Sequence, residues 1–380
     1  MRQRLHESSR ISIHVGIDAR CLNTDHLRGM GKYVSAMLSH ARDANDLRWT
    51  LFGDRPEAPF HKPPDLEARK DLFNFRGYRF HTWEQVGLPL RARRANVDIL
   101  HCTGTTLPLW QPMRTLVTLH DGLLWQSPGG ERLNAGWYLE RLIPAAFHRA
   151  WGIITISEQS RRDILGMWPS LEPKLHLIPH GIADSYLHAG HASPPEGVLA
   201  ALEGSGYLLY VGGGLKRKRF DWALRVFQRL DHPGVRLCVC GFSHEGSLTA
   251  QAGLESHLRG RVLFLPFVAE SEMPGLYRNA IAVLYPTLYE GFGFPVVEAQ
   301  AVGTPVLFSA VGSLQELSGP GAEILPTEDI EAWVTTARRL VSERGGSLSV
   351  NEHARSWARR FSWSESARRH VELYRKAASG

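Results

Sequence analysis

The chain reads Glu290-Gly291-Phe292-Gly293-Phe294-Pro295-Val296-Val297-Glu298 just after a short apolar run at residues 280–286. The length of that run and the breakers beside it predict a buried parallel strand. The two glycines leave backbone amides uncovered at the start of a helix that Pro295 can begin, so a hydroxylated or anionic ligand can approach the main chain. Glu298 lies just over one turn inside that helix, and its carboxylate can face the same crevice.

Two carboxylates at this spacing suit a ligand with two sugars. A carboxylate can accept two hydrogen bonds from a vicinal diol such as that of a ribose, and a second carboxylate beside glycine amides can hold a hexose. Two sugars joined by a diphosphate make a nucleotide sugar. The alternative interpretation is a solvated helix start with two unrelated glutamates.

The pattern Glu-Gly-Phe-Gly-x-Pro-x-x-Glu resembles the Glu-x7-Glu signature of the retaining glycosyltransferases of family 4, and the resemblance extends over nearly the whole chain. It implies that Glu298 holds the ribose of the donor and that Glu290 holds its sugar. It also implies that Gly291, Phe292 and Gly293 offer backbone amides to the donor.

A glycine turn near the start of the chain predicts a first phosphate site. Residues 11–18 read as a strand and residues 29–41 as a helix, so Gly29 and Gly31 place amides at the positive end of a helix dipole. A simple tight connection is the alternative. The Gly-Ile-Asp-Ala-Arg run followed by Gly-x-Gly-Lys-Tyr is similar to the opening of many family members.

A second phosphate site is predicted after the strand at residues 207–211. Three glycines follow that strand, and Arg217 with Lys218 can neutralise the charge of a diphosphate. The segment resembles the Gly-x-x-x-x-Arg-Lys-Asn element of the family, although Arg219 stands where asparagine is usual. A solvated basic turn is the alternative.

Two predicted strands, residues 97–102 and 115–121, carry His101 and His120 near their ends. Ligands of open α/β sheets bind beyond the carboxyl ends of strands, so both histidines are expected to point toward the cleft. His120 with Asp121 looks like the family element whose histidine meets the donor sugar and the reacting centre. A helix-capping pair is the alternative.

Other segments receive narrower interpretations. By resemblance, the main chain at Phe267 and Val268 meets the base of the nucleotide. Ser157 is expected to be a helix N-cap without a catalytic role. The aromatic segment at residues 125–139 suits a loop and helix that face the acceptor.

Composition describes a globular protein, with 43% hydrophobic and 22% charged residues in 380. The four cysteines show no Cys-x-x-Cys spacing and are expected to be free, buried thiols. The chain contains no Asp-x-Asp and no His-x-x-x-His pair beside a glutamate, so we expect no metal and no cofactor beyond the nucleotide-sugar substrate.

Positive charge is concentrated in the first half of the chain. Residues 1–185 carry 24 Lys and Arg against 19 Asp and Glu, net +5, whereas residues 186–380 carry 20 against 19, net +1. Such a surface can attract anionic lipid, although a solvated face is the alternative. No basic tract is interleaved with aromatic residues as single-strand binders require, so we expect no nucleic acid partner.

Residues 83–96 combine apolar side chains with Arg91, Arg93 and Arg94. They predict either a peripheral contact with an anionic membrane or an ordinary surface helix. The sequence has no run of 18 apolar residues, and its first ten residues lack the apolar stretch of a signal peptide, so we expect a cytoplasmic protein at the inner face of the cell membrane.

The resemblance implies the GT-B arrangement, in which two Rossmann-like domains face a central cleft. We expect an acceptor domain at residues 1–182 and a nucleotide-sugar domain at residues 183–361. The segment at residues 351–378 is expected to be helical, and a helix at about 362–380 is expected to pack back on the first domain.

The implied activity is the metal-independent transfer of a hexose with retention of the anomeric configuration. The donor expected by resemblance is GDP-mannose or a related GDP-sugar, and the acceptor is a lipid-linked glycan or an oligosaccharide in bacterial surface polysaccharide synthesis. A UDP-sugar donor, a sugar-nucleotide epimerase and a noncatalytic sugar-nucleotide-binding protein are the alternatives.

Overall fold

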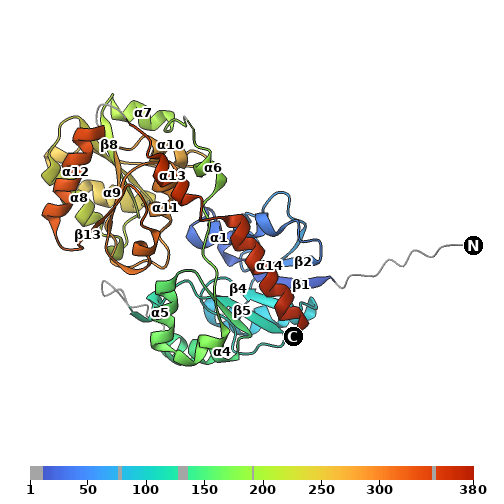
Figure 1. Ribbon diagram of the computed structural model, residues 1–380. Helices are drawn as coiled ribbons and strands as arrows, with labels where there is room; N and C mark the ends of the chain where they lie inside the picture. Colours follow the sequence, from blue (N-terminus) through green and yellow to red (C-terminus); the bar gives the residue numbers. More distant parts are fainter. Residues whose placement is uncertain (1–11, 76–78, 127–135, 191, 345–347) are drawn as a thin grey trace, which may run out of the picture.

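The computed structural model describes residues 12–75, 79–126, 136–190, 192–344 and 348–380. The chain forms two lobes, each built on a parallel sheet with helices packed around it (Figure 1). Within the described residues, the first sheet has seven strands in the order β3-β2-β1-β4-β5-β6-β7. The second has six in the order β10-β9-β8-β11-β12-β13. The predicted α/β class with two Rossmann-like sheets is confirmed.

The strands of the first sheet are β1 (Ile13–Asp18), β2 (Leu47–Gly53), β3 (Ala68–Leu72), β4 (Ile99–Cys102), β5 (Arg114–Thr118), β6 (Gly152–Thr155) and β7 (Leu175–Leu177). Its helices and turns are η1 (Arg20–Leu22), α1 (Gly29–Ala41), η2 (Arg79–Gly87), α2 (Leu88–Arg94), α3 (Leu123–Gln126), η4 (Tyr138–Leu142), α4 (Ile143–Arg149), α5 (Glu158–Met167) and η5 (Pro169–Lys174).

The strands of the second sheet are β8 (Gly206–Val211), β9 (Val235–Cys240), β10 (Val262–Phe264), β11 (Ala282–Tyr285), β12 (Val306–Ser309) and β13 (Ala322–Leu325). The helices and turns of the remaining chain are α6 (Asp184–Leu187), α7 (Glu196–Leu202), η6 (Lys216–Lys218), α8 (Phe220–Leu230), α9 (His244–Ala252), η7 (Ser256–Leu258), α10 (Met273–Arg278), α11 (Phe294–Ala301), η8 (Gly312–Leu317), α12 (Ile330–Arg344), α13 (Glu352–Ala358) and α14 (Trp363–Ser379).

Both sheets reverse their strand order beside their first strand. The order changes direction between β1 and β4 in the first sheet and between β8 and β11 in the second. Loops that leave such neighbouring strands diverge and open a crevice at the carboxyl ends. The loop after β8 and the loop after β11 therefore meet at one crevice in the second lobe.

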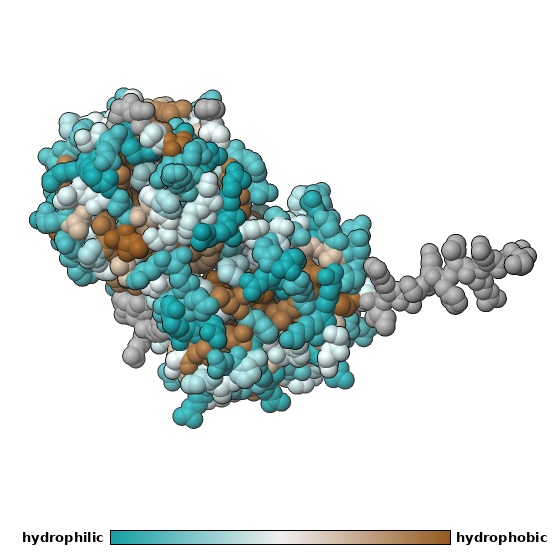
Figure 2. Space-filling model, in the orientation of Figure 1, coloured by the Kyte–Doolittle hydropathy of each residue, from teal (hydrophilic) through white to brown (hydrophobic). Residues whose placement is uncertain are grey.

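Apolar periodicity explains how the elements pack. β11 and β12 are buried along their whole length, as strands covered on both faces must be. α8 turns Trp222, Val226 and Phe227 to the sheet, the spacing of one helix face. Figure 2 shows that the visible face of both lobes is mostly hydrophilic, with hydrophobic residues in scattered patches.

The last helix, α14, packs on the first lobe next to α1 (Figure 1). It buries Trp363, Ala367, Val371 and Tyr374, which share one face of the helix. In the structure the chain thus lies on the first lobe again after α13.

The chain passes between the lobes twice, and the two crossings lie side by side. The Ile182 amide donates to the Phe361 carbonyl at 3.0 Å. A Cβ on Gly181 would lie 2.1 Å from the Trp363 nitrogen, so only glycine fits there. The division of the chain at residues 182 and 361 stays a prediction, and these crossings support it.

A chain of buried hydrogen bonds ties α14 to the first sheet. His370 Nδ1 donates to the Ser366 carbonyl at 2.8 Å, so its Nε2 accepts from the Tyr33 hydroxyl at 2.9 Å. Thr118 lies between Tyr33 and His101, at 2.9 and 2.8 Å from them. The other ring nitrogen of His101 accepts from Tyr374 at 2.7 Å.

The structure corrects the interpretation of His101. Its ring is fully buried, and both of its nitrogens are satisfied within this chain of hydrogen bonds. The residue lies inside β4 rather than beyond its end, so it does not point into the cleft.

One other difference from the sequence expectations concerns local structure. The strand β3 was not predicted because its sequence, Ala-Arg-Lys-Asp-Leu, is largely polar at an edge of the sheet. The segment at residues 351–378 is helical and is divided into α13 and α14, with the crossing between the lobes after α13. Most of the segment at residues 125–139 lies outside the described residues.

Residues 83–96 pack mainly on their own lobe. Trp83 and Leu88 are buried, and Arg91 pairs with Asp71 at 2.6 Å and covers the Phe73 ring. Trp83 and Leu88 are therefore not exposed to a membrane, and the peripheral membrane contact stays a prediction. Arg93 and Arg94 remain exposed.

Acidic pH is expected to weaken the fold through the buried histidines. Burial lowers the pKa of His370 to about 4 and that of His101 well below its usual range. The unfolded chain therefore takes up protons below pH about 6.5 that the folded chain does not, and the free energy of unfolding falls between pH about 6.5 and 4. Urea unfolding at several pH values measures this loss.

The raised carboxyl pKa values of Asp121 and Glu298 act in the opposite direction, so the informative quantity is a difference between variants. We expect His370→Gln to have a shallower pH profile than the wild type. Replacement of the exposed His244 by Gln should leave the slope unchanged. Equal slopes for wild type and His370→Gln would contradict the prediction.

Candidate functional site

The crevice of the second lobe gathers two cations around one carboxylate. Glu290 follows β11, whereas Arg217 and Lys218 follow β8, and strand pairing makes these loops neighbours. Glu290 Oε1 accepts from Arg217 Nη1 at 3.0 Å and from Thr287 Oγ1 at 2.9 Å, and it also pairs with Lys218 Nζ. The structure therefore brings together three of the predicted catalytic residues.

The charges in this cluster depend on each other. Burial alone would raise the pKa of Glu290, but Lys218 and Arg217 outweigh it and hold that pKa below its ordinary value. Burial lowers the pKa of Lys218, and Glu290 opposes that effect. Glu290 is consequently an ionised carboxylate with little access to water.

Glu298 is the second buried carboxylate, in the first turn and a half of α11. Its Oε2 accepts from the Tyr277 hydroxyl at 2.6 Å, and its Oε1 lies 3.6 Å from Lys32 Nζ of the first lobe. Burial raises the pKa of Glu298, and Lys32 works against that rise. Neither Tyr277 nor Lys32 could be assigned to Glu298 from the sequence alone.

The glycine loop between the two glutamates has carbonyls that are bound and amides that are not. Ser313 Oγ donates to the carbonyls of Glu290 and Phe292 at 2.9 and 3.0 Å, and Ser160 Oγ donates to that of Gly291 at 3.3 Å. No described residue accepts from the amides of Gly291, Phe292 or Gly293. The loop can therefore donate to an anion or a hydroxyl, as predicted for it.

Two of these residues are glycine for reasons that the structure makes plain. A Cβ on Gly291 would lie 2.7 Å from Asp121 Oδ2 and 2.8 Å from the His120 carbonyl, both in the first lobe. Gly293 has a φ of 99°, and a Cβ there would collide with Leu314. Phe292 is buried against His180 and Phe294, so only its main chain can meet a ligand.

His120 lies beyond the end of β5 and faces the glycine loop through this close approach. Its Nε2 donates to the Thr103 carbonyl at 2.9 Å, which leaves Nδ1 as the acceptor. Burial lowers the pKa of His120 to about 4, so the imidazole is neutral at pH 7. It can accept a hydrogen bond from a hydroxyl but carries no charge.

Asp121 has a different environment. Its Oδ1 accepts from the Leu123 amide at 2.9 Å, which caps the short helix α3. Burial raises its pKa to about 6, and the nearby Glu290 adds to the rise. The helix-capping alternative therefore describes Asp121, while His120 remains available to the crevice.

Polar contacts join the lobes at the mouth of the crevice. The Glu316 carboxylate accepts from the amides of Glu158 and Gln159, at 2.9 and 2.5 Å, at the start of α5. The Tyr289 hydroxyl donates to Asp163 at 2.7 Å. Ser157 is the N-cap of α5, as predicted, because its side chain accepts from the Ser160 amide.

The remaining predicted residues are spread over the two lobes. Gly29 begins α1 and is exposed, whereas Gly31 is buried and a Cβ there would lie 2.8 Å from the Cys21 carbonyl. Gly31 is thus explained by packing. Phe267 is 64% exposed, and its ring stacks on that of His26 of the first lobe with the ring centroids 4.2 Å apart. Val268, the next residue, is half-buried.

Arg219 occupies a left-handed backbone position, with a φ of 53°, at the start of α8. Asparagine adopts that conformation more readily than most residues, which explains why a family element would place it there. Arg219 instead pairs with Glu328 at 2.9 Å and covers the Trp222 ring. It does not join the cluster around Glu290.

Sequence reasoning missed the residues that support the two glutamates. Thr287 and Tyr289 adjoin the glutamate motif, so their neighbourhood alone could have suggested them. Tyr277, Ser313 and Glu316 lie on other elements and reach the site only through the fold. No local pattern marks such residues.

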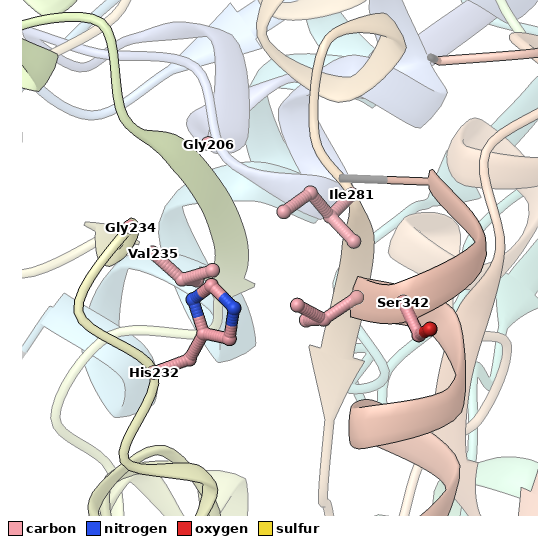
Figure 3. Close-up of a pocket in the computed structure, with 7 residues that line it drawn as sticks. Gly206, His232, Gly234, Val235, Ile281 and Ser342 are labelled. Carbon is pink, nitrogen blue, oxygen red and sulfur yellow. The ribbon is translucent and has the colours of Figure 1, made fainter. Parts of the chain in front are cut away.

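A separate hollow of about 290 Å³ lies at the opposite, amino-terminal end of the second sheet (Figure 3). Its labelled residues include His232, Ile281 and Ser342. It is far along the strands from Glu290, because β11 begins beside Ile281 and ends before the glutamate loop. This hollow is not part of the candidate site.

The described part of the chain contains neither a metal-binding cluster nor a membrane-spanning helix. No three His, Cys, Asp or Glu side chains among the described residues are grouped closely enough to hold a metal ion. In the same residues, no helix has the length and hydropathy needed to cross a membrane. The four cysteines are free, and three of them are buried.

Two family models match complementary parts of the chain. The one described as Glycosyltransferase Family 4 matches residues 27–186, and the one described as Glycosyl transferases group 1 matches residues 197–360. O-antigen chain mannosyltransferase B of Escherichia coli is 26% identical over 270 residues, which is 69% of this chain and 70% of that protein.

Two further comparisons agree with these. MMP alpha-(1->4)-mannosyltransferase of Mycolicibacterium hassiacum is 26% identical over 323 residues, 76% of this chain and 72% of that protein. The structure of sucrose-phosphate synthase from Thermosynechococcus elongatus superimposes with a TM-score of 0.74 at 20% identity, covering 96% of this chain and 98% of that one. At that identity the likeness concerns the fold alone.

Replacement of Glu316 by Gln is expected to loosen the contact between the lobes. The neutral amide is a weaker acceptor for the α5 amides and loses its attraction to the positive end of the helix. Hydrogen exchange should become faster at Glu158 and Gln159. Glu328→Gln, which removes a carboxylate paired only within the second lobe, is the matched control, and equal exchange in both variants would contradict the prediction.

Proposed function

Since the chain belongs to the family 4 glycosyltransferases and has the GT-B fold, we propose that it transfers a hexose from a GDP-sugar to a lipid-linked glycan or an oligosaccharide. The sugar would be mannose or a close relative, and the product a bacterial surface polysaccharide. Because the matching families are glycosyltransferases, the epimerase and the noncatalytic alternatives are not retained.

The observation that carries the proposal is a pair of buried carboxylates, Glu290 and Glu298, with two cations beside Glu290. Between the two carboxylates lie three backbone amides, those of residues 291–293, that donate to no described residue. Arg217 and Lys218 supply positive charge for a diphosphate, and Glu298 supplies an acceptor for a ribose diol. Glu290 and the neutral His120 would hold hydroxyls of the donor sugar. The mannosyltransferases among the relatives favour mannose.

In the proposed reaction, Arg217 and Lys218 stabilise the charge that develops on the departing diphosphate. Metal independence is part of the proposal, since these side chains can supply that stabilisation themselves. Retention would follow from an internal-return route, in which the leaving phosphate takes the proton of the acceptor hydroxyl on the same face of the sugar. Nothing in this route requires Glu290 as a nucleophile.

Thermal unfolding in the presence of GDP-, UDP- and dTDP-sugars tests the donor. A ligand at a hundred times its dissociation constant stabilises the folded state by about 2.7 kcal/mol, so the true donor should stand out. We expect GDP-mannose to protect best and transfer to continue in excess chelator. A strong preference for UDP-sugars would show that the donor is a UDP-sugar rather than a GDP-sugar. Inactivation by chelator that magnesium or manganese reverses would overturn metal independence.

Glu298→Ala is expected to weaken binding of the nucleotide whichever sugar it carries. Loss of charge-assisted hydrogen bonds to the ribose costs about 1.5–3 kcal/mol, or about ten- to a hundredfold in affinity. Isothermal titration with the nucleoside diphosphate measures the effect. The exposed Glu255→Ala is the control, and unchanged affinity in Glu298→Ala would rule out the assignment.

Peripheral membrane contact is a further part of the proposal and rests on the exposed Arg93 and Arg94. Each well-placed cation contributes about 1 kcal/mol near anionic lipid, an attraction that salt screens. The wild type should sediment with anionic vesicles at low ionic strength, and Arg93→Glu with Arg94→Glu should abolish sedimentation. Arg91 is left in place because it pairs with Asp71. Undiminished binding by the double variant would show that the docking surface is elsewhere.

A further inference from the structure

Lys32 reaches across the cleft from the first lobe into the ribose end of the candidate site. It lies in the first turn and a half of α1, and its Nζ is 2.7 Å from Glu270 Oε2 and 3.6 Å from Glu298 Oε1. Both carboxylates belong to the second lobe. Among the described residues, Lys32 is the only cation that forms an ion pair with Glu298.

The two carboxylates need this cation to different degrees. The Glu270 side chain is 48% exposed, so water can solvate its charge without Lys32. The Glu298 side chain is only 5% exposed, and a buried carboxylate without a cation is costly. The ion pair therefore matters mainly for the charge state of Glu298.

The oxygens of Glu298 keep acceptor capacity for a further donor. Tyr277 occupies one lone pair of Oε2, and Lys32, at 3.6 Å, lies beyond ordinary hydrogen-bond distance from Oε1. A carboxylate has about four lone-pair sites, so a diol can donate to Glu298 while both neighbours stay in place.

We propose that Lys32 is a positioning residue for the nucleotide: it keeps Glu298 ionised as the acceptor for the ribose diol, and it does so from the opposite lobe. The inference rests on the proposed function, because it takes the ribose site at Glu298 from it. Closure of the two lobes thereby completes the ribose site. The lysine of the Gly-x-Gly-Lys-Tyr opening acquires a role that its sequence position did not reveal.

Four ionisable groups of the described residues surround Glu298. Lys32 comes from α1, Glu270 from the loop after β10, Tyr277 from α10 and Tyr186 from α6. Of these, only Lys32 favours the ionised carboxylate by its charge, whereas Glu270 opposes it. Removing Lys32 thus leaves burial and Glu270 acting together to favour protonation of Glu298.

The first test is titration calorimetry with GDP and with UDP at pH 6, 7 and 8. We expect Lys32→Met to weaken binding about tenfold at pH 7, because a neutral carboxyl forms weaker hydrogen bonds than a carboxylate. The loss should be larger at pH 6 and smaller at pH 8, while the wild type changes less over this range. Lys32→Arg should restore most of the affinity, and the exposed Lys70→Met should behave as wild type.

The second test asks whether Lys32 acts through Glu298. In a double-mutant cycle, Lys32→Met added to Glu298→Gln should cause little further loss, because glutamine has no charge to maintain. Additive losses would overturn the inference, as would a loss in Lys32→Met that does not vary with pH. Thermal unfolding of each variant shows that the fold is retained.

The ribose assignment of Glu298 and the positioning role of Lys32 would be overturned by different results. If Glu298→Gln binds the nucleoside diphosphate as tightly as wild type, the ribose assignment is wrong and the inference falls with it. If Glu298→Gln binds weakly but Lys32→Met binds as wild type, the proposed function stands and only the role of Lys32 is overturned.

Discussion

A buried carboxylate stays ionised only when a cation or strong hydrogen-bond donors compensate its charge, and this constraint governs the crevice of the second lobe. Removing one partner of a buried ion pair typically costs about 3–5 kcal/mol, far more than a surface pair contributes. Glu290 meets the constraint with Arg217 and Lys218, which come from the loop after a different strand. Those loops are neighbours only because the strand order reverses between β8 and β11. The topology of the sheet is thus what makes the charge cluster stable.

The same constraint extends across the cleft. Glu298 takes its cation from α1 of the first lobe. The exposed Glu316 instead accepts hydrogen bonds from the amides of α5. These interlobe contacts are polar, so water can replace them when the lobes separate, unlike contacts of a hydrophobic core. The aromatic and aliphatic packing of α14 holds the first lobe to the chain that returns from the second. The contacts that water can replace therefore lie at the mouth of the crevice. The contacts of the hydrophobic core lie where the chain crosses between the lobes.

The sequence predicted the elements that carry their own local signal. Buried strands such as β11 and the glutamate motif after it were recognisable, because a run of apolar residues followed by glycines is visible in one stretch. The polar edge strand β3 was missed because an edge strand needs no apolar pattern. His101 was misplaced because burial depends on α14, which lies more than 250 residues away. Tyr277 and Lys32 were invisible for the same reason, since neither is near Glu298 in the chain.

In the proposed reaction, the site would exchange one set of charge partners for another. In this structure Arg217 and Lys218 are neutralised by Glu290. A donor brings a diphosphate, whose oxygens are better bidentate partners for a guanidinium than a single carboxylate oxygen is. When the cations turn to the diphosphate, Glu290 loses them and gains the hydroxyls of the sugar as donors. A nucleoside diphosphate without the sugar would draw the cations away and leave Glu290 uncompensated, so the buried cluster itself would favour the intact nucleotide sugar over that fragment.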